Sequence, residues 1–106
     1  MKIYIAGPMT GIEELNFPLF FFTAARLRAE GYDVVNPAEI NANLNVKPSA
    51  VWAECMSADI RELMTCDAVF MLPGWGASRG AILEHHIASA LGMVVLLEIP
   101  ILEASI

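Results

Sequence analysis

The sequence predicts an α/β fold in which helices cover both faces of a four-stranded parallel sheet. Four short apolar runs, rich in β-branched residues, occupy residues 2–6, 32–36, 68–72 and 93–97. Their hydrophobicity is continuous rather than alternating, which is typical of parallel strands buried on both faces. Helical segments separate the runs, so each connection has the length that a parallel crossover requires.

The first helical segment follows the first strand and ends at Gly31. Asn16 is predicted to cap it ahead of Pro18, and Phe20, Ala24 and Leu27 then recur at helical spacing. A second helix is expected over residues 49–64, and a third over residues 78–91, ended by Gly92. Right-handed crossovers then give a doubly wound, flavodoxin- or Rossmann-like three-layer sandwich with strand order 2-1-3-4.

Length and composition indicate the class of protein. The 106 residues contain no linker-like stretch, which predicts a single domain over residues 1–106. Hydrophobic residues make up 57% of the chain and charged residues 17%, which favours a sheet covered on both faces and a homodimer or larger homo-oligomer. No apolar run is long enough to cross a bilayer and the start does not resemble a secretory signal, so we expect a cytoplasmic protein without membrane contact.

Charge and cysteine content narrow the expected partners. A formal net charge of −6 disfavours polymeric nucleic acid, although one helix terminus with one Arg can still bind a small anion. Cys55 and Cys66 match no metal-ligand spacing and are expected to be reduced, part-buried thiols. We predict no metal and no cofactor.

Two glycine-bearing loops should meet at the ligand crevice. In doubly wound sheets this crevice lies beyond the carboxyl ends of the strands, where the winding direction reverses. The loop after the first strand reads Gly7-Pro8-Met9-Thr10-Gly11, and the loop after the third reads Pro73-Gly74-Trp75-Gly76-Ala77-Ser78.

Two carboxylates interrupt apolar helical faces beside this crevice. At 100° per residue, Glu84 shares its side of the third helix with Ala81, Ile87, Ala88 and Leu91. Asp59 lies in the same way among Trp52, Met56, Ile60 and Leu63 of the second helix. Buried carboxylates are normally paired, hydrogen-bonded or functional. The alternative is structural: each acid caps a loop, pairs with Arg61 or Arg79, or reaches the rim because the helix boundaries differ slightly.

Other residues at the crevice have both a structural and a functional interpretation. The Tyr4 hydroxyl either holds a carboxylate or simply needs a buried partner. Ser78 is the expected N-cap of the third helix, and with the free amides of Arg79 and Gly80 it would also hold a phosphate. Trp75 either stacks on a base or closes the core, and the adjacent His85 and His86 are expected at the surface or an interface.

Together these residues resemble the nucleoside 2-deoxyribosyltransferase superfamily, which includes 2-deoxynucleoside 5-phosphate N-hydrolases. The similarity runs from Tyr4 to about Gly92 and is carried by three motifs: Tyr4-Ile5-Ala6-Gly7-Pro8-Met9-Thr10-Gly11, Asp59, and Ser78-Arg79-Gly80-Ala81-Ile82-Leu83-Glu84 with Ala88. The loop Pro73-Gly74-Trp75-Gly76 is also similar to that of phosphoribohydrolases of the cytokinin-activating type, but its spacing to Glu84 differs.

The resemblance implies that Glu84 is a nucleophile, that Tyr4 orients it and that Asp59 helps the base leave. The transferases usually carry Asp six positions before the nucleophile, whereas the monophosphate hydrolases carry Ser, and here the residue is Ser78. The first loop lacks the Arg that the hydrolases often place there. We therefore expect cleavage of the N-glycosidic bond of a nucleoside 5-monophosphate or nucleoside, by hydrolysis rather than transfer. The alternatives are a nucleotide-binding or interaction module without turnover, and an oligomerisation subunit.

Overall fold

A four-stranded, all-parallel sheet forms the centre of the computed structural model, which describes residues 1–44 and 52–97. The strands are β1 (Lys2–Ala6), β2 (Asp33–Val35), β3 (Ala68–Met71) and β4 (Val94–Leu97), in the order β2-β1-β3-β4. The predicted order 2-1-3-4 is confirmed. β1 is a central strand, with Tyr4 paired to Val35 on one side and to Val69 on the other.

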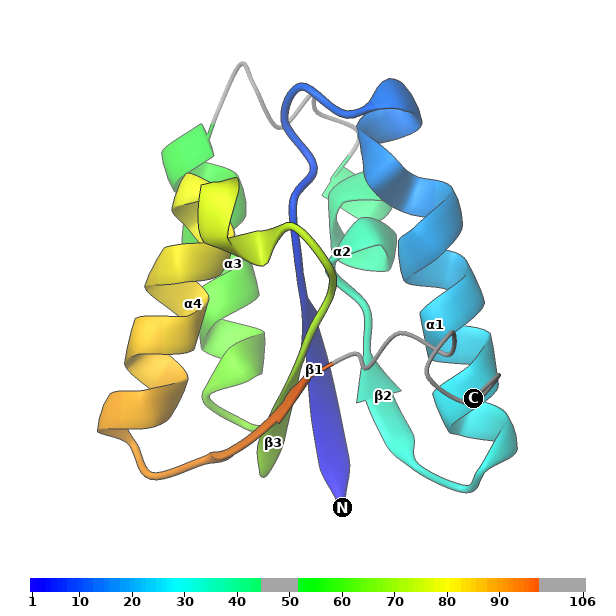
Figure 1. The fold of residues 1–106 in the computed structure, drawn as a ribbon, viewed down its shortest axis with the longest axis vertical. Coiled ribbons are helices and arrows are strands. Elements are labelled where there is room, and N and C mark those ends of the chain that lie inside the picture. Colours follow the sequence, from blue (N-terminus) through cyan, green and yellow to red (C-terminus); the bar gives the residue numbers. More distant parts are fainter. Residues whose placement is uncertain (45–51, 98–106) are drawn as a thin grey trace, which may run out of the picture.

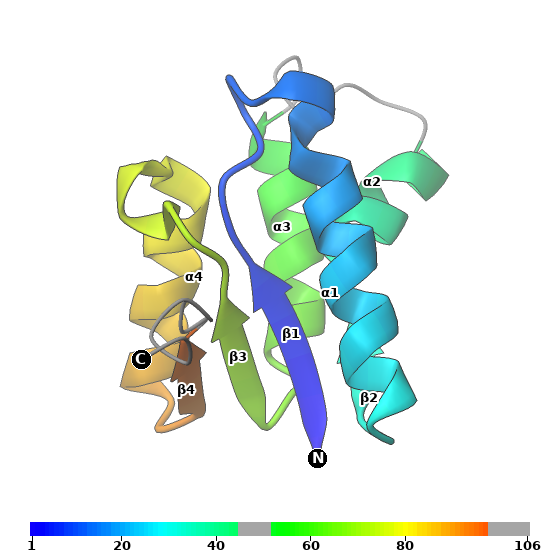
Figure 2. The same cartoon turned by 45° about the vertical axis from the view of Figure 1, so that its right-hand side comes forward.

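Helices cover both faces of this sheet. Figure 1 shows α1 (Phe17–Ala29) on one side of the strands, and α3 (Trp52–Leu63) and α4 (Arg79–Ala90) together on the other. Turning the molecule by 45° keeps the same arrangement (Figure 2). Two short 3₁₀ helices, η1 (Glu13–Asn16) and η2 (Trp75–Ala77), lie in the loops that precede α1 and α4.

The alternation of side chains along β1 creates two separate cores. Ile3 and Ile5 pack with Phe20, Ala24 and Leu27 of α1. Tyr4 and Ala6 point to the opposite face, where they pack with residues of α3 and α4: Leu63, Ala81 and Ala88. Successive strand residues face opposite sides of a sheet, so Tyr4 is buried beneath α3 and α4. Apart from Lys2, it is the only polar side chain in β1.

An additional helix, α2 (Pro37–Leu44), follows β2 and was not predicted. Asn36 explains its start, because its side-chain Oδ1 accepts a hydrogen bond of 2.9 Å from the amide of Ala38. Asn followed by Pro37 and by Glu39 in the first turn is a recognisable start signal for a helix. The segment escaped prediction because it is short. The second helix was expected from residue 49, but residues 49–51 lie outside the described part.

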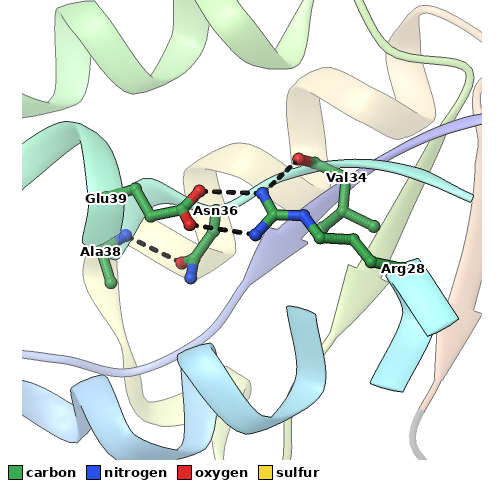
Figure 3. Close-up of polar contacts among 5 residues, drawn as sticks. All are labelled: Arg28, Val34, Asn36, Ala38 and Glu39. Atoms are coloured by element: carbon green, nitrogen blue, oxygen red, sulfur yellow. Dashed lines mark hydrogen bonds and ion pairs between the residues drawn. The ribbon is translucent and has the colours of Figure 1, made fainter. Parts of the chain in front are cut away.

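A charged contact ties α1 to β2 and α2 (Figure 3). Both terminal nitrogens of Arg28 donate to the carboxylate of Glu39, at 3.0 and 2.8 Å, and one of them also donates to the carbonyl of Val34 at 2.8 Å. These hydrogen bonds lower the pKa of Glu39 from its ordinary value. The fork of the guanidinium matches a carboxylate, so this contact links the first turn of α2 to the last turn of α1.

Two local expectations were wrong. Asn16 does not cap α1 with its side chain; its backbone is left-handed (φ 61°), and its Nδ2 donates instead to the carbonyl of Pro8 at 3.0 Å. Leu91 does not share the buried side of α4, since it follows the last helical turn and is 58% exposed. No helix in residues 1–44 and 52–97 is long and apolar enough to span a membrane.

Candidate active site

A cavity of about 770 Å³ opens at the carboxyl ends of the strands, where the sequence placed the crevice. Its walls come from the loops after β1 and β3, from Pro37 after β2, and from α1, α3 and α4. Eight residues named from the sequence line it: Gly7, Met9, Thr10, Asp59, Ser78, Arg79, Gly80 and Glu84. Five of these eight residues have polar or charged side chains, and many of the other wall residues are apolar.

Glu84 lies in the second turn of α4 and points inward, as its position on the helix predicted. It is 4% exposed, and Tyr4, fully buried in β1, donates its hydroxyl to Glu84 Oε2. Tyr4 lies beneath the cavity and is not among the described residues that line it. A central strand and a helix thus fix the direction of one carboxylate before any ligand arrives.

Asp59 supplies a second buried carboxylate. It is 5% exposed, lines the cavity from α3, and its Oδ1 has no hydrogen-bond partner among the described residues. In the described part of the chain, neither Asp59 nor Glu84 forms an ion pair with Arg61 or Arg79. Pairing with an arginine therefore does not explain why these two acids are buried. A buried acceptor without a partner is costly, and a ligand in the cavity can satisfy it.

Burial sets the proton affinity of the three groups. It raises the pKa of Glu84 to about 8, and the negative charge of Asp59 adds to this while the hydrogen bond from Tyr4 opposes it. Burial raises the pKa of Asp59 to about 7. Burial, followed by the nearby charges of Glu84 and Asp59, raises the pKa of Tyr4 well above its ordinary value. Tyr4 therefore remains a donor, and both acids exchange protons near neutral pH.

The start of α4 forms one polar end of the cavity. Ser78 is its N-cap, as predicted, and its Oγ accepts a hydrogen bond of 3.2 Å from the amide of Ala81. The amides of Arg79 and Gly80 precede the first internal helical hydrogen bond and face no carbonyl of the helix. This end of α4 is suited to an anion, because the helix dipole and the free amides act together.

Besides Tyr4, two of the residues named from the sequence do not line the cavity. Gly11 and Trp75 are not among the described residues that line the cavity. Trp75 instead stacks on His85, with ring centres 4.5 Å apart, and packs against the core beneath α4. Its structural interpretation, closing the core, agrees with this placement. His85 is half-buried by the stack, and His86 is exposed.

The apolar wall formed by α3 was missed as part of the site. Trp52, Cys55 and Met56 line the cavity, and the guanidinium carbon of Arg79 lies 4.0 Å from the centre of the Trp52 ring. Their signal in the sequence was their spacing with Asp59 on one helical face, which indicated burial but not exposure to a cavity. Cys55 and Cys66 are free thiols, as expected, but both are buried rather than part-buried.

Two glycines keep the walls close together. A Cβ at Gly7 would lie 2.7 Å from Cβ of Leu72, so the chain after β1 can pass the end of β3 only without a side chain. A Cβ at Gly80 would lie 3.1 Å from Sδ of Met56. The first loop and the start of α4 are thereby held next to the rest of the site.

Fold and site together define a doubly wound α/β protein with a cavity that carries two buried carboxylates at the carboxyl edge of its sheet. Residues 1–97 match the family model described as Domain of unknown function (DUF4406), and the chain belongs to that family. Comparison with curated proteins finds no match. The family description assigns no activity, so the roles inferred from the deoxyribosyltransferase resemblance remain predictions.

Proposed function

We propose that this protein cleaves the N-glycosidic bond of a nucleoside 5-monophosphate or nucleoside, with Glu84 as nucleophile, by hydrolysis rather than base transfer. The observation that carries the proposal is the buried carboxylate of Glu84, which lines the cavity and is held by the Tyr4 hydroxyl. A carboxylate with a fixed direction in a low-dielectric site is suited to attack on the anomeric carbon of a sugar.

In the proposed reaction, a carboxylate oxygen of Glu84 forms a bond to the anomeric carbon while the bond from that carbon to the base nitrogen breaks. The electron pair of the broken bond stays with the base, and Asp59, with its pKa near 7, supplies the proton that the base requires. Water then attacks the anomeric carbon of the glycosyl ester and gives one proton to the ionised Asp59. The bond to Glu84 breaks, which returns its carboxylate and leaves the sugar with a free hydroxyl. The scheme follows the two-carboxylate logic of retaining glycosidases.

Burial favours the neutral form of Glu84 in the empty site, whereas attack needs its ionised form. Two effects favour ionisation during the reaction. The Tyr4 hydrogen bond lowers the pKa of Glu84, and positive charge developing on the sugar ring attracts the carboxylate. The deep burial that makes this charge expensive in the empty site also strengthens its interaction with the transition state.

The preference for a phosphate is supported by the start of α4. Ser78 lines the cavity as the N-cap of α4, and the two amides after it are free of helical partners. A carboxylate at this position would repel a phosphate, whereas a hydroxyl and free amides attract it. Substrate binding, on this proposal, uses this polar end for the phosphate and the walls of α1 and α3 for the base.

The decisive experiment compares Glu84→Gln with the unchanged protein on a panel of nucleosides and monophosphates, with and without acceptor base. Free base is followed by chromatography. Release should fall by at least about 1000-fold in Glu84→Gln, since loss of a nucleophile removes the covalent route. Glu62→Gln, an exposed substitution on α3, is the matched control and should retain the full rate. An undiminished rate in Glu84→Gln would refute the assignment.

A second candidate is a nucleotide-binding module without turnover, and the first loop, which lacks the expected Arg, favours it. It predicts that calorimetry detects nucleotide binding while no base is released over hours. We further propose that the protein is a cytoplasmic homodimer or larger assembly, with α3 as the candidate interface element. Sedimentation at micromolar concentration tests the assembly, and a monomer there would contradict it.

A further inference from the structure

Arg79 has an unusual position among the residues that line the cavity. It is the only cationic side chain among those described, and it belongs to the first residue of α4, directly after Ser78. Its guanidinium carbon lies 4.0 Å from the centre of the Trp52 ring, across the gap between α4 and α3. Within the described part of the chain it has no ion pair and no hydrogen bond, so its N–H donors remain available.

The Trp52 ring is held in place for this contact. Trp52 begins α3 and is half-buried, and its indole nitrogen would lie 3.9 Å from a Cβ at Gly80. At that distance a Cβ would make only ordinary van der Waals contact, so the indole lies directly beside the start of α4. Arg79 is therefore stacked on a ring that stands beside the free amides of its own helix.

The stacked position of Arg79 is one that a phosphate can replace. A guanidinium on an aromatic face at a solvent-exposed site is held more weakly than one that makes two charge-assisted hydrogen bonds to a phosphate. An arginine that stacks on a ring is already extended toward the site, so its side chain loses less conformational entropy when it binds a ligand. Movement of the guanidinium from the ring to the ligand thus gains binding energy without a change of backbone.

The electrostatics of the cavity support an anion at this end. Asp59 and Glu84 are the acids that line it among the described residues, and burial raises the pKa of each, which keeps part of their negative charge suppressed near neutral pH. The unpartnered, buried Oδ1 of Asp59 independently indicates that the same cavity accommodates a polar ligand. With Glu84 mostly protonated and Asp59 about half protonated near pH 7, the charge of Arg79 and the dipole of α4 favour an anion at this end of the cavity.

We propose that the Arg79 side chain is the phosphate-binding cation of this site and that Trp52 stores it on its ring until a phosphate monoester arrives. The inference rests on the proposed function for the identity of the ligand, a nucleotide. It adds a side chain that takes the place of the Arg missing from the first loop, and it makes Trp52 a positioning residue rather than a wall.

Phosphate binding by Trp52 fluorescence tests the inference without turnover. The background variant Trp75→Phe leaves Trp52 as the single indole, and Trp75 is not among the described residues that line the cavity. Inorganic phosphate is titrated at constant ionic strength, followed by a nucleoside and its monophosphate. Inorganic phosphate is expected to give a saturable change in Trp52 emission, because the guanidinium leaves the ring. The base of a nucleoside also contacts the α3 wall, so for the nucleotide the phosphate effect is the difference between the monophosphate and the nucleoside.

Variants identify the cation. Arg79→Gln should abolish the emission change and weaken binding of the monophosphate about tenfold or more, while nucleoside binding changes less than about twofold. Arg61→Gln removes the same charge from the exposed last turn of α3 and should leave both affinities unchanged. Calorimetry follows the Trp52 variants, which lack the reporting indole: Trp52→Phe should retain phosphate binding because it keeps an aromatic face, and Trp52→Leu should weaken it. Equal phosphate affinities in Arg79→Gln and Arg61→Gln would overturn the inference.

The phosphate-binding and base-release experiments test the two proposals separately. Arg79-dependent phosphate binding without release of any base would remove the glycosidase proposal and keep this inference. Base release at the same rate from nucleosides and monophosphates, with phosphate binding that does not depend on Arg79, would do the reverse.

Discussion

The hydroxyl of Tyr4, in the central strand, donates a hydrogen bond to Oε2 of Glu84, in the helix that covers the same face of the sheet. Both side chains are buried, and both belong to regular elements that are fixed by the core. The contact therefore depends on the packing of α4 against β1 rather than on a flexible loop. Catalytic geometry built on helices and strands is more accurate than geometry built on loops.

Replacing Tyr4 by Phe should reduce base release by roughly 10-fold to 100-fold, because one hydrogen bond to a charged group is worth about 1.5 to 3 kcal/mol. The same change removes the interaction that lowers the pKa of Glu84, so the acidic limb of the pH–rate profile should move to higher pH. Kinetics between pH 5 and pH 9 measure both effects. Tyr32→Phe, at a part-exposed position before β2, is the control, and an unshifted profile in Tyr4→Phe would contradict the proposed role.

Stability should fall as pH rises from about 4 to about 8. Asp59 and Glu84 ionise near 3.8 and 4.5 in the unfolded chain, but near 7 and 8 in the folded protein. Between these limits the folded state binds more protons than the unfolded state, so the free energy of unfolding decreases with pH, by at most about 4 to 5 kcal/mol per group. Urea unfolding at several pH values measures the slope.

The variant Asp59→Asn with Glu84→Gln provides the control for this pH dependence. It should unfold with a nearly flat profile over the same range, because neither amide titrates. Glu39 acts in the opposite sense at lower pH: Arg28 lowers its pKa, so its contribution is present above its ordinary value and is lost on acidification. A wild-type profile that rises between pH 5 and pH 8 would contradict the assigned shifts.

Gly7→Ala should destabilise the protein by about 1 to 3 kcal/mol, the usual cost of forcing extra volume into a packed contact. The new Cβ would meet Leu72 at 2.7 Å, and Leu72 is itself fully buried, so the loop after β1 must move. Gly76→Ala is a matched change at a glycine with nothing within 4 Å, and it should alter stability by less than about 0.5 kcal/mol. Similar midpoints of thermal unfolding for the two variants would show that the first loop tolerates a side chain.

Substitutions at Ser78 separate its structural role from its proposed binding role. Ser78→Ala removes the cap of α4 and should cost about 1 kcal/mol of stability, whereas Ser78→Asp keeps a capping oxygen and should cost little. Ser78→Asp should nevertheless weaken binding of monophosphates more than of nucleosides, because it adds a negative charge beside the phosphate. Equal weakening of both ligand classes would exclude a phosphate at this position.

Much of the architecture could be predicted because β-branched apolar runs and helix ends are local signals. β1 was placed residue for residue, the cap at Ser78 was identified from its position, and Gly31 and Gly92 mark chain turns with positive φ after α1 and α4. The helix α2 was missed since eight residues leave too little periodicity to recognise. Asn16 was misassigned because a cap signal could not reveal that Pro8, in the preceding loop, competes for its side chain.

The part of the candidate site that could be predicted from the sequence is the pair of acids that lie on apolar helical faces. An acid on an apolar helical face is a contradiction visible in the sequence, and both Asp59 and Glu84 proved to be buried in the cavity wall. By contrast, Trp75 is placed by its stack on His85, which the sequence did not predict. Trp52 lines the cavity where α3 packs against Arg79 and Gly80 of α4. These are contacts between elements, and their geometry is not encoded by spacing within one helix.

Tyr4, Asp59 and Glu84 come from a strand and two helices that lie far apart along the chain and meet only when the sheet is assembled. A compound that engages Asp59 and Glu84 has no such site to bind in the denatured ensemble, so occupancy should raise the melting temperature as the logarithm of its concentration increases. Thermal-shift screening of metabolite libraries can thus reveal the physiological ligand even when its chemical conversion is too slow to detect.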